Sequence, residues 1–333
     1  MKKRALICGV SGQDGAYLSK HLLNKGYEVV GTSRNAEQSA FSNLKALGVE
    51  QSIDTLSMDP SDFASVISVL KKIEPTEIYN LSGQSSVSLS FSQPTETFKS
   101  IVIATLNILE GMRAIDNTCK FYNAASSEIF GDTGGKKANE NTMFNPLSPY
   151  GVAKAAAVWN VRNYRKSYGL YACSGILFNH ESPLRPINFV TRKIVHTACQ
   201  IKLGNADTLE MGNLEIRRDW GWAPEYVEAM HEMLQIESPK DFIIATGETS
   251  SLKDFVQTTF EILNLNWKEH VTVNKKYFRP NELLENRADP RKAKRELGWS
   301  ARLKMRAIIE KLVESELQNS NKENIDKRLA AKG

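Results

Sequence analysis

The chain has 333 residues, 41% of them hydrophobic and 24% charged, a composition that is ordinary for a globular enzyme and argues against a disordered or fibrous protein. An excess of 43 Lys and Arg over 38 Asp and Glu gives a net charge of +5, which is compatible with anionic substrates but predicts no nucleic-acid partner. No apolar run approaches the roughly 18 residues of a membrane-spanning helix, and the run after Met1–Arg4 is too short for a signal peptide, so no membrane partner is expected.

Short apolar runs alternate with longer amphipathic segments over the first half of the chain. The predicted strands are Arg4–Cys8, Tyr27–Thr32, Ile53–Met58, Glu77–Leu81, Lys120–Ala125 and Tyr171–Leu177. The predicted helices between them are Tyr17–Lys25, Asp62–Lys72, Thr95–Ala114 and Tyr150–Tyr168. In the second helix Phe63, Val66, Ile67 and Leu70 recur at helical spacing and predict one apolar face. This alternation predicts an α/β fold, with a doubly wound parallel sheet covered by helices on both faces.

After Asn179 the pattern loosens into short elements separated by turn signals such as Ser182-Pro183 and Asp289-Pro290. We expect a smaller C-terminal cap that binds the substrate, with some chain segments crossing back to the sheet. The expected units are residues 1–178 for the sheet domain, about 213–246 for the segments that return to it, 179–318 mainly for the cap, and 319–333 for a flexible, solvated tail.

Three glycines, Gly9, Gly12 and Gly15, lie between the first predicted strand and the first helix, and Gln13 and Asp14 complete the loop. Glycines at this spacing let the backbone approach a pyrophosphate, whose negative charge then meets the amides at the helix start. A plain strand-to-helix turn would also use glycine. The context on both sides favours a dinucleotide site of the Rossmann type.

The residues after the second and third strands bear on the choice of cofactor. An NAD site usually has an acid after the second strand to bind the ribose hydroxyls, whereas this chain has Arg34. A guanidinium there suits a 2′-phosphate and predicts NADP, the alternative being a solvated surface arginine. Asp59 follows the third strand and either bonds an adenine amino group or caps the helix opening at Pro60.

A second group of polar residues has the spacing of a catalytic site. Tyr150 and Lys154 are four residues apart, which places both side chains on one helix face, where the ammonium and a nicotinamide would lower the pKa of the phenol. Ser126 and Glu128 close the fifth strand, at the carboxyl edge where open sheets bind ligands. Ser126 can donate a hydrogen bond to the oxygen that Tyr150 serves. Glu128 is either a base that removes a proton next to a carbonyl or a helix cap.

These motifs resemble the extended short-chain dehydrogenase/reductase superfamily and, more closely, the GDP-mannose 4,6-dehydratases. The resemblance extends from about Arg4 to Trp299. Its most specific stretches are Gly9–Gly15, Glu77–Leu81, Tyr171–Cys173, Gly175–Pro183, Phe189–Ile194, Arg218–Gly221, Tyr277–Pro280 and Asp289–Trp299.

The resemblance implies an NADP-dependent lyase that converts GDP-mannose to GDP-4-dehydro-6-deoxy-D-mannose for deoxysugar synthesis. It implies that Tyr150 acts as base on the C4 hydroxyl, that Lys154 binds the nicotinamide ribose, and that Ser126 occupies the family's threonine position. Glu128 would remove the C5 proton and protonate the departing C6 hydroxyl, after which the hydride returns to C6.

The resemblance also implies which residues bind the rest of the ligands. The GDP site is matched by Asn179, Val190, Lys193, Arg218, Arg279 and Glu282. Gln84 and Ser85 follow the fourth strand, where the family contacts cofactor or sugar. His180 would suit a metal or acid–base role, but no second ligand is spaced near it, so we expect a structural role and no metal. The four cysteines lack C-x-x-C spacing and are expected to be free thiols in the cytoplasm.

Several positions depart from the family pattern. Leu184 and Trp222 stand where the family often has arginine and histidine, which allows the same chemistry on another GDP-sugar such as GDP-manno-heptose. A reductase or epimerase of the same superfamily is a second alternative, against which Glu128 argues, and a non-catalytic nucleotide-sugar binding protein is a third. No second arginine or tetramer-forming loop follows Arg34, so we expect a homodimer through Thr95–Ala114 and Tyr150–Tyr168, with a tetramer as the alternative.

Overall fold

The computed structural model describes residues 3–115, 118–278 and 281–330, with side chains up to residue 320. Its centre is a seven-stranded sheet in the order β11-β6-β5-β4-β1-β2-β3, in which every strand pair is parallel. The strands are β1 (Arg4–Cys8), β2 (Glu28–Ser33), β3 (Asp54–Ser57), β4 (Glu77–Asn80), β5 (Lys120–Ser126), β6 (Ala172–Leu177) and β11 (Phe242–Ile244). The predicted α/β fold with a doubly wound parallel sheet is confirmed.

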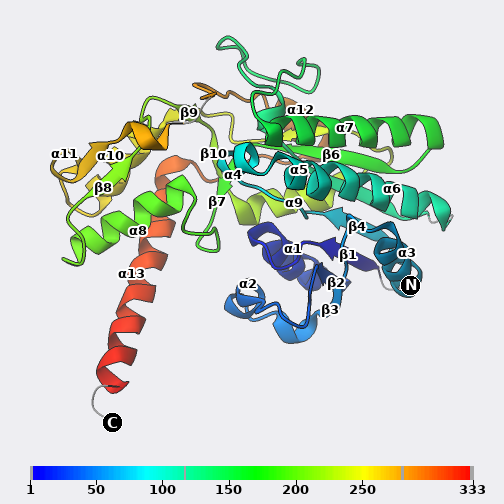
Figure 1. Cartoon of the computed structure of the whole chain (residues 1–333), viewed down its shortest axis with the longest axis horizontal. Helices are drawn as coiled ribbons and strands as arrows, with labels where there is room; N and C mark the ends of the chain where they lie inside the picture. Colours follow the sequence, from blue (N-terminus) through cyan, green and yellow to red (C-terminus); the bar gives the residue numbers. More distant parts are fainter. Residues whose placement is uncertain (1–2, 116–117, 279–280, 331–333) are drawn as a thin grey trace.

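Helices cover both faces of this sheet (Figure 1). One layer contains α1 (Gln13–Asn24) and α9 (Ala223–Met233), and the other contains α3 (Phe63–Ile73), α6 (Ala104–Ala114) and α7 (Pro149–Tyr168). Alternate strand residues serve the two layers, since Ile7 of β1 belongs to the core beneath α1 and α9, and Leu6 to the core beneath α3 and α6. A strand buried on both faces needs such a continuous apolar run.

Two of the predicted helices differ in detail. The segment predicted as Thr95–Ala114 is divided into α5 (Pro94–Phe98), a π-helical turn (Lys99–Ile103) and α6. In α3 the predicted apolar face was partly wrong, because Phe63 is 43% exposed and the buried stripe begins one turn later, at Val66. The stripe starts there because α3 packs on α6 at Gly111, where an added Cβ would lie 2.9 Å from Leu70 Cδ1.

A second core lies beside the sheet and is built from the C-terminal half of the chain. Its helices are α8 (Val190–Lys202), α10 (Leu252–Ile262) and the first part of α13 (Met305–Ala330). Short strand pairs complete it: β7 (Asn179–Glu181) with β10 (Trp220–Trp222), β9 (Arg217–Arg218) with β12 (Ser250–Ser251), and β8 (Leu209–Met211) with β13 (Val271–Val273). The remaining helices are α2 (Ser42–Ala46), α4 (Val87–Ser92), α11 (Trp267–His270) and α12 (Arg291–Leu297).

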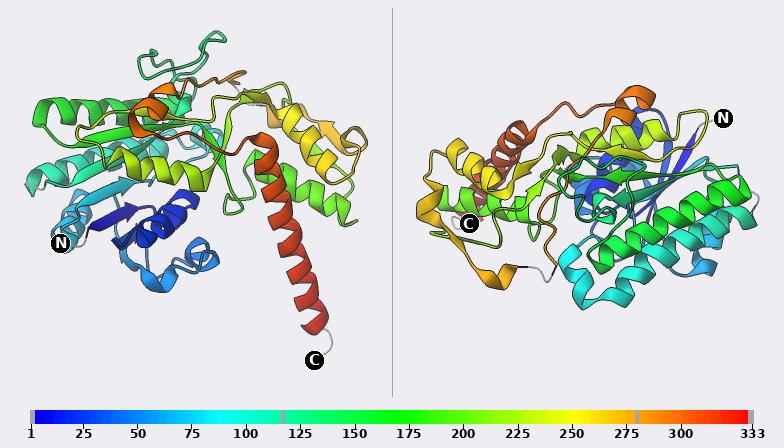
Figure 2. Two further views of the ribbon diagram at one scale, coloured as in Figure 1. Left: turned by 180° about the vertical axis from the view of Figure 1, so that it is seen from behind. Right: turned by 90° about the horizontal axis from the view of Figure 1, so that it is seen from above.

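Residues 223–244 return to the sheet as α9 and β11, the latter pairing with β6. The exact limits of the expected units stay a prediction. The flexible tail expected from residue 319 also stays a prediction. As far as residue 330 this part of the chain belongs to α13, which extends away from the rest of the molecule (Figure 2). Among the described residues, every helix is too short or too polar to cross a bilayer.

Candidate active site

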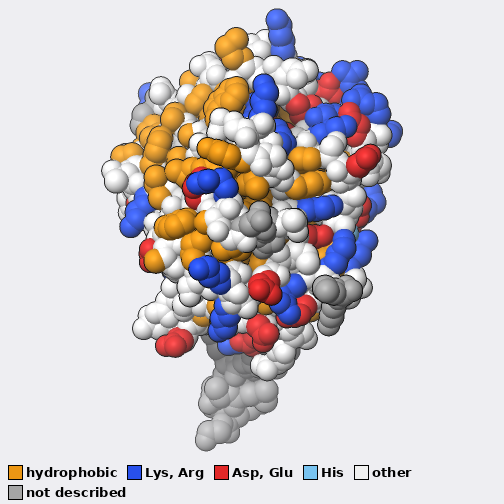
Figure 3. All heavy atoms as spheres, turned by 90° about the vertical axis from the view of Figure 1, so that its right-hand side faces the viewer, with side chains coloured by type: hydrophobic (Ala, Val, Ile, Leu, Met, Phe, Trp, Pro, Cys, Tyr) orange, Lys and Arg blue, Asp and Glu red, His pale blue; other side chains and the backbone are white. Residues whose placement is uncertain are grey.

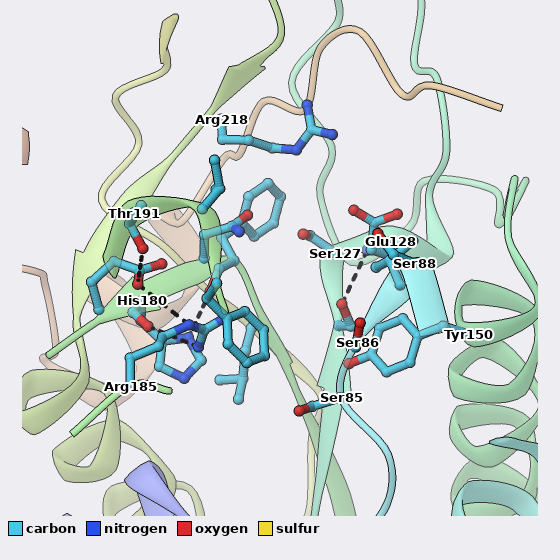
Figure 4. A pocket seen from close by; sticks show the side chains of 18 of the residues that line it. Ser85, Ser86, Ser88, Ser127, Glu128, Tyr150, His180, Arg185, Thr191 and Arg218 are labelled. Carbon is cyan, nitrogen blue, oxygen red and sulfur yellow. Dashed lines mark hydrogen bonds and ion pairs between the residues drawn. The ribbon is translucent and has the colours of Figure 1, made fainter. Parts of the chain in front are cut away.

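A cavity of about 480 Å³ lies between the carboxyl edge of the sheet and the C-terminal core. Figure 4 shows Ser85, Glu128 and Tyr150 on its sheet side, facing His180 and Arg218 on the other side. Its size and its position outside the carboxyl ends of parallel strands are those of a ligand site in a doubly wound fold. The lining residues therefore come from both halves of the chain.

The residues predicted to be catalytic share the sheet side of this cavity. Ser126 ends β5, and its Oγ accepts a hydrogen bond of 3.3 Å from the backbone N–H of Glu128. Tyr150 lies in the first turn of α7, which is capped by Ser148 through a bond of 3.0 Å from the N–H of Gly151. That glycine is needed for a close approach, because a Cβ there would lie 2.8 Å from the carbonyl oxygen of Glu128. The sequence thus brings the start of α7 directly over the end of β5.

The protonation of this group is set by its burial. Burial raises the pKa of Tyr150 to about 12, against the lowering effect of a hydrogen bond with Ser126. The predicted lowering of the phenol's pKa therefore does not follow from the protein's own groups. Burial also lowers the pKa of Lys154 to about 8, and its ammonium donates a hydrogen bond of 2.7 Å to the carbonyl of Ala124. Lys154 is thus anchored to β5, with its Nζ 5.8 Å from the centre of the Tyr150 ring.

The glycine loop has the geometry that a pyrophosphate site requires. Gly9 has a φ of +84°, and a Cβ there would lie 2.9 Å from the carbonyl oxygen of Leu81. A Cβ on Gly15 would lie 2.5 Å from the carbonyl oxygen of Gly9, so only glycine permits this packing. Helix α1 begins at Gln13, earlier than predicted, and its N-cap Gly12 offers no capping side chain. The amides of the first turn are then available to an anion.

Asp14 joins this loop to the other side of the cavity. Its Oδ2 lies 2.9 Å from His180 Nε2, and its Oδ1 accepts a hydrogen bond of 2.9 Å from Gln13. Burial acts to raise the pKa of Asp14, but the charge and hydrogen bond of His180 outweigh it and lower that pKa. For the same reason the pKa of His180 is raised although burial opposes its charge. Gln13 in turn accepts a bond of 2.7 Å from Ser182, so its side chain holds β7 against α1.

His180 has a partner at each ring nitrogen and on one face of its ring. Its Nδ1 lies 2.8 Å from the carbonyl of Phe178, and its ring stacks on Tyr226 with centroids 4.6 Å apart. No cluster of three or more metal-ligating side chains occurs within the described ranges. The His180–Asp14 pair nevertheless lines the cavity, which gives this histidine a position at the site that the sequence did not predict.

Arg185 is a cavity residue that sequence reasoning missed. It donates a hydrogen bond of 3.2 Å to the carbonyl of His180, pairs with Glu181 at 3.3 Å, and lies 4.1 Å from the centre of the Phe189 ring. Glu181 is fully buried and also accepts a bond of 2.6 Å from Thr191. The available signal was position, because Arg185 follows the specific stretch that ends at Pro183 by two residues.

Arg34 and Asp59 lie apart from the cavity, after β2 and β3. Arg34 is 76% exposed and pairs with Glu96 at 3.5 Å. Asp59 accepts bonds from the N–H and Oγ of Ser61, at 2.9 and 2.7 Å. The expectation of a helix cap at Asp59 was wrong, because α3 begins later and is capped by Asp62. The contact of Asp59 with adenine stays a prediction.

The loop after β4 lines the cavity through Gln84 and Ser85. The side chain of Gln84 donates bonds of 2.8 Å to the carbonyl of Ser86 and 3.2 Å to Thr97 Oγ1, so it fixes the loop. Ser85 projects into the cavity (Figure 4). Gln84 also lines the cavity, so both Gln84 and Ser85 are accessible to a ligand bound there.

The predicted nucleotide end is assembled on the cap. Asn179, Val190, Lys193, Arg218 and Glu282 all line the cavity. Lys193 donates a bond of 2.6 Å to the carbonyl of Glu210, and burial lowers its pKa in spite of the Glu210 charge. Arg218 is only 4% exposed and bonds the carbonyl of Arg217 at 3.0 Å. Arg279 lies outside the described residues.

Comparisons with known proteins find similarity over nearly the whole chain. A family model described as GDP-mannose 4,6 dehydratase matches residues 6–312. GDP-mannose 4,6 dehydratase 1 of Arabidopsis thaliana is 43% identical over 97% of this chain and 92% of its own length. GDP-mannose 4,6-dehydratase of Vibrio cholerae is 39% identical over 96% and 95%. Among solved structures, a dTDP-glucose 4,6-dehydratase of Bacillus anthracis in complex with NAD superimposes with a TM-score of 0.82 at 18% identity, over 96% of this chain and 98% of that one.

Proposed function

Because the chain belongs to the GDP-mannose 4,6-dehydratase family, we propose that it is a lyase that converts GDP-mannose to GDP-4-dehydro-6-deoxy-D-mannose and so supplies deoxysugar synthesis. The observation that carries this proposal is the position of Glu128, which lies on the same side of the cavity as Tyr150 (Figure 4) and whose backbone N–H bonds Ser126 Oγ. A carboxylate next to a hydroxyl-oxidising pair is what an elimination needs, because removal of a proton beside a carbonyl requires a base.

A nicotinamide cofactor, when bound, would accept hydride from C4 of the hexose and return it to C6. Tyr150 takes the proton of the C4 hydroxyl, while Ser126 hydrogen-bonds the same oxygen. The C4 carbonyl makes the C5–H bond acidic, and Glu128 accepts that proton. Glu128 then delivers it to the C6 oxygen, which leaves as water. When hydride returns to C6, C5 takes up a proton in place of the one it lost, and Tyr150 can release the proton of the C4 hydroxyl, so the cycle closes without net reductant.

The residues present fit NADP. The glycine loop leaves room for a pyrophosphate only because Gly9 and Gly15 lack a Cβ. Lys154, anchored on β5, would bind the nicotinamide ribose, and Asp14, Gln84 and the loop amides would be further contacts. Arg34 supplies the positive charge that a 2′-phosphate needs after the second strand.

The cap would bind the GDP portion. Lys193 and Arg218 bring fixed positive charge to a diphosphate, and Arg279 extends this set by resemblance. Glu282 would accept hydrogen bonds from the ribose hydroxyls, and Asn179 and Val190 border the same part of the cavity.

The reaction is tested by following the loss of water, the transfer of hydrogen from C4 to C6 and the consumption of reductant. The purified protein is incubated with GDP-mannose without added reductant, and mass spectrometry is expected to find repeated turnover to a product lighter by one water. Deuterium placed at C4 should reappear at C6 of the same molecule. Net consumption of NADPH would indicate a reductase instead, and turnover of GDP-manno-heptose alone from a panel of GDP-sugars would change the assigned substrate.

A further inference from the structure

Four charged side chains form a cluster where β2 and β3 end: Arg34, Asp59, Glu96 and Lys99. The two strands pair in parallel with Ser33 opposite Ser57, so Arg34 and Asp59 follow neighbouring strands. Glu96 belongs to α5 and Lys99 starts the π-helical turn that continues it. The contact of 3.5 Å between Arg34 Nη1 and Glu96 Oε1 joins the helical segment to the strand end.

The two cations of this cluster act on the same carboxylate. Burial acts to raise the pKa of Asp59, but its bonds with Ser61 and the charges of Lys99 and Arg34 lower it. Lys99 is exposed, and within the described part of the chain it has no hydrogen-bond or ion-pair partner. Two positive and two negative groups leave the cluster with no net charge, so a phosphate dianion would bind by direct contact with the two cations and would compete with Glu96 for Arg34.

We infer that Lys99 is the second cation of the 2′-phosphate site and that Glu96 is the residue that limits the preference for NADP over NAD. This inference rests on the proposed NADP-dependent function. A phosphate monoester carries a charge of roughly −2 and binds best to more than one cationic donor. The residues that follow Arg34 are Asn35 and Ala36, which are uncharged, so the sequence offers no second cation on β2 itself. Lys99, reaching the same place from the turn after α5, supplies it.

Glu96 competes with the phosphate for Arg34. The pair is exposed, with 76% of the Arg34 side chain and 48% of the Glu96 side chain accessible, so the contact is weak and separates at little cost. In the absence of a 2′-phosphate the Glu96 carboxylate holds the guanidinium. When a 2′-phosphate is bound, the same carboxylate repels it. Its removal therefore strengthens the binding of NADP more than that of NAD.

The test measures binding rather than turnover. Dissociation constants of NADPH and NADH are obtained by fluorescence titration, and those of adenosine 2′,5′-diphosphate and 5′-AMP by calorimetry. Lys99→Met is expected to weaken NADPH and the 2′,5′-diphosphate about tenfold while changing NADH and 5′-AMP less than about twofold. Glu96→Gln is expected to tighten the 2′-phosphorylated ligands roughly threefold to fivefold. Lys72→Met, at the far end of α3, and Glu314→Gln, on α13, are the matched controls and should change nothing.

The possible failures are distinguishable. Equal effects of Lys99→Met on both cofactors, or no effect on either, would overturn the role of Lys99, and unchanged selectivity in Glu96→Gln would overturn that of Glu96. Arg34→Ala serves as the reference: if it removes the preference for NADPH while the other two variants do nothing, the proposed cofactor stands and only this inference is wrong. If Arg34→Ala weakens both cofactors equally, the NADP assignment itself fails. Circular dichroism and retained NADH binding establish that each variant is folded.

Discussion

At the scale of single residues, the cavity combines groups whose charge is set by burial with groups whose charge is set by a partner. Tyr150 and Lys154 are buried. Burial raises the pKa of Tyr150 and lowers that of Lys154, and both shifts favour the neutral form of the group. Asp14 and His180 are also largely enclosed, yet the pKa of each is shifted in the direction that favours its charged form, because the other is 2.9 Å away. The first pair is suited to proton exchange and the second to holding two segments together.

Glu128 gives the most direct test of the chemistry. Glu128→Gln keeps the size and the hydrogen-bonding capacity of the side chain but removes the base, so loss of water should fall by roughly 100-fold or more. Oxidation at C4 uses Tyr150 and should persist. Single-turnover absorbance of the reduced cofactor, measured against product formation, separates the two steps. Dehydration at the parental rate would show that another group removes the C5 proton.

The Asp14–His180 pair predicts a pH dependence of stability. The pKa of His180 is raised above its unfolded value, so its contribution is complete below about pH 6.5 and is lost as pH rises through the folded pKa. The pKa of Asp14 is lowered, so its contribution is complete above about pH 4 and is lost only in stronger acid. Asp14→Asn should therefore lower the free energy of unfolding by about 2 kcal/mol at pH 6 and flatten its decline toward pH 8.

Urea unfolding at pH 6 and pH 8 measures both effects, and Asp207→Asn, at an exposed position, is the control. A decline between the two pH values that is the same in Asp14→Asn and in the parent would mean that this pair does not stabilise the fold.

At the scale of elements, the sequence predicted the strands and helices that follow from local patterns. It did not predict the contacts that depend on packing between distant segments. The first six strands and the helical turn that carries Tyr150 follow from apolar runs and spacing, which the chain carries locally. The exposure of Phe63 depends on where α3 crosses α6, and the pairing of Arg34 with Glu96 depends on contacts between segments far apart in sequence. Arg185 was missed for the same reason, because only the fold brings it to the cavity.

Helix α7 shows how one element fixes the geometry of the proposed catalytic group. Gly151→Ala would place a Cβ 2.8 Å from the carbonyl oxygen of Glu128, which forces the first turn of α7 away from β5. Tyr150 moves with that turn, so the rate at saturating substrate should fall roughly 10- to 100-fold while the KM for the GDP-sugar, bound mainly by the cap, changes little. Val152→Ala, on the same turn but 41% exposed, should leave the rate unchanged. A rise in KM with an unchanged rate at saturating substrate would assign Gly151 to substrate binding instead.

At the scale of the whole molecule, the layer that contains α6 and α7 has one side on the sheet and the other exposed. Figure 3 shows apolar side chains gathered on the face that lies at the right of Figure 1. Ile103, Val152, Trp159 and Tyr168 are exposed apolar residues of the segment from the π-helical turn to the end of α7. An apolar helical face of this kind is typical of an interface between copies of a chain.

We therefore expect a homodimer in which α6 and α7 of two copies pack together, and the argument can be tested at Trp159, the most exposed of these side chains at 57%. Trp159→Asp would place a charge within this expected interface, where desolvation is costly, so the dissociation constant of the dimer should rise by at least about tenfold. Analytical ultracentrifugation measures this directly. Leu203→Asp, an exposed apolar residue after α8 in the cap, is the control and should leave the assembly unchanged. Because the cavity lies at the carboxyl edge of the sheet and the dimer face on α6 and α7, a monomeric Trp159→Asp variant should still bind the cofactor. A variant that stays dimeric would place the interface elsewhere on the molecule.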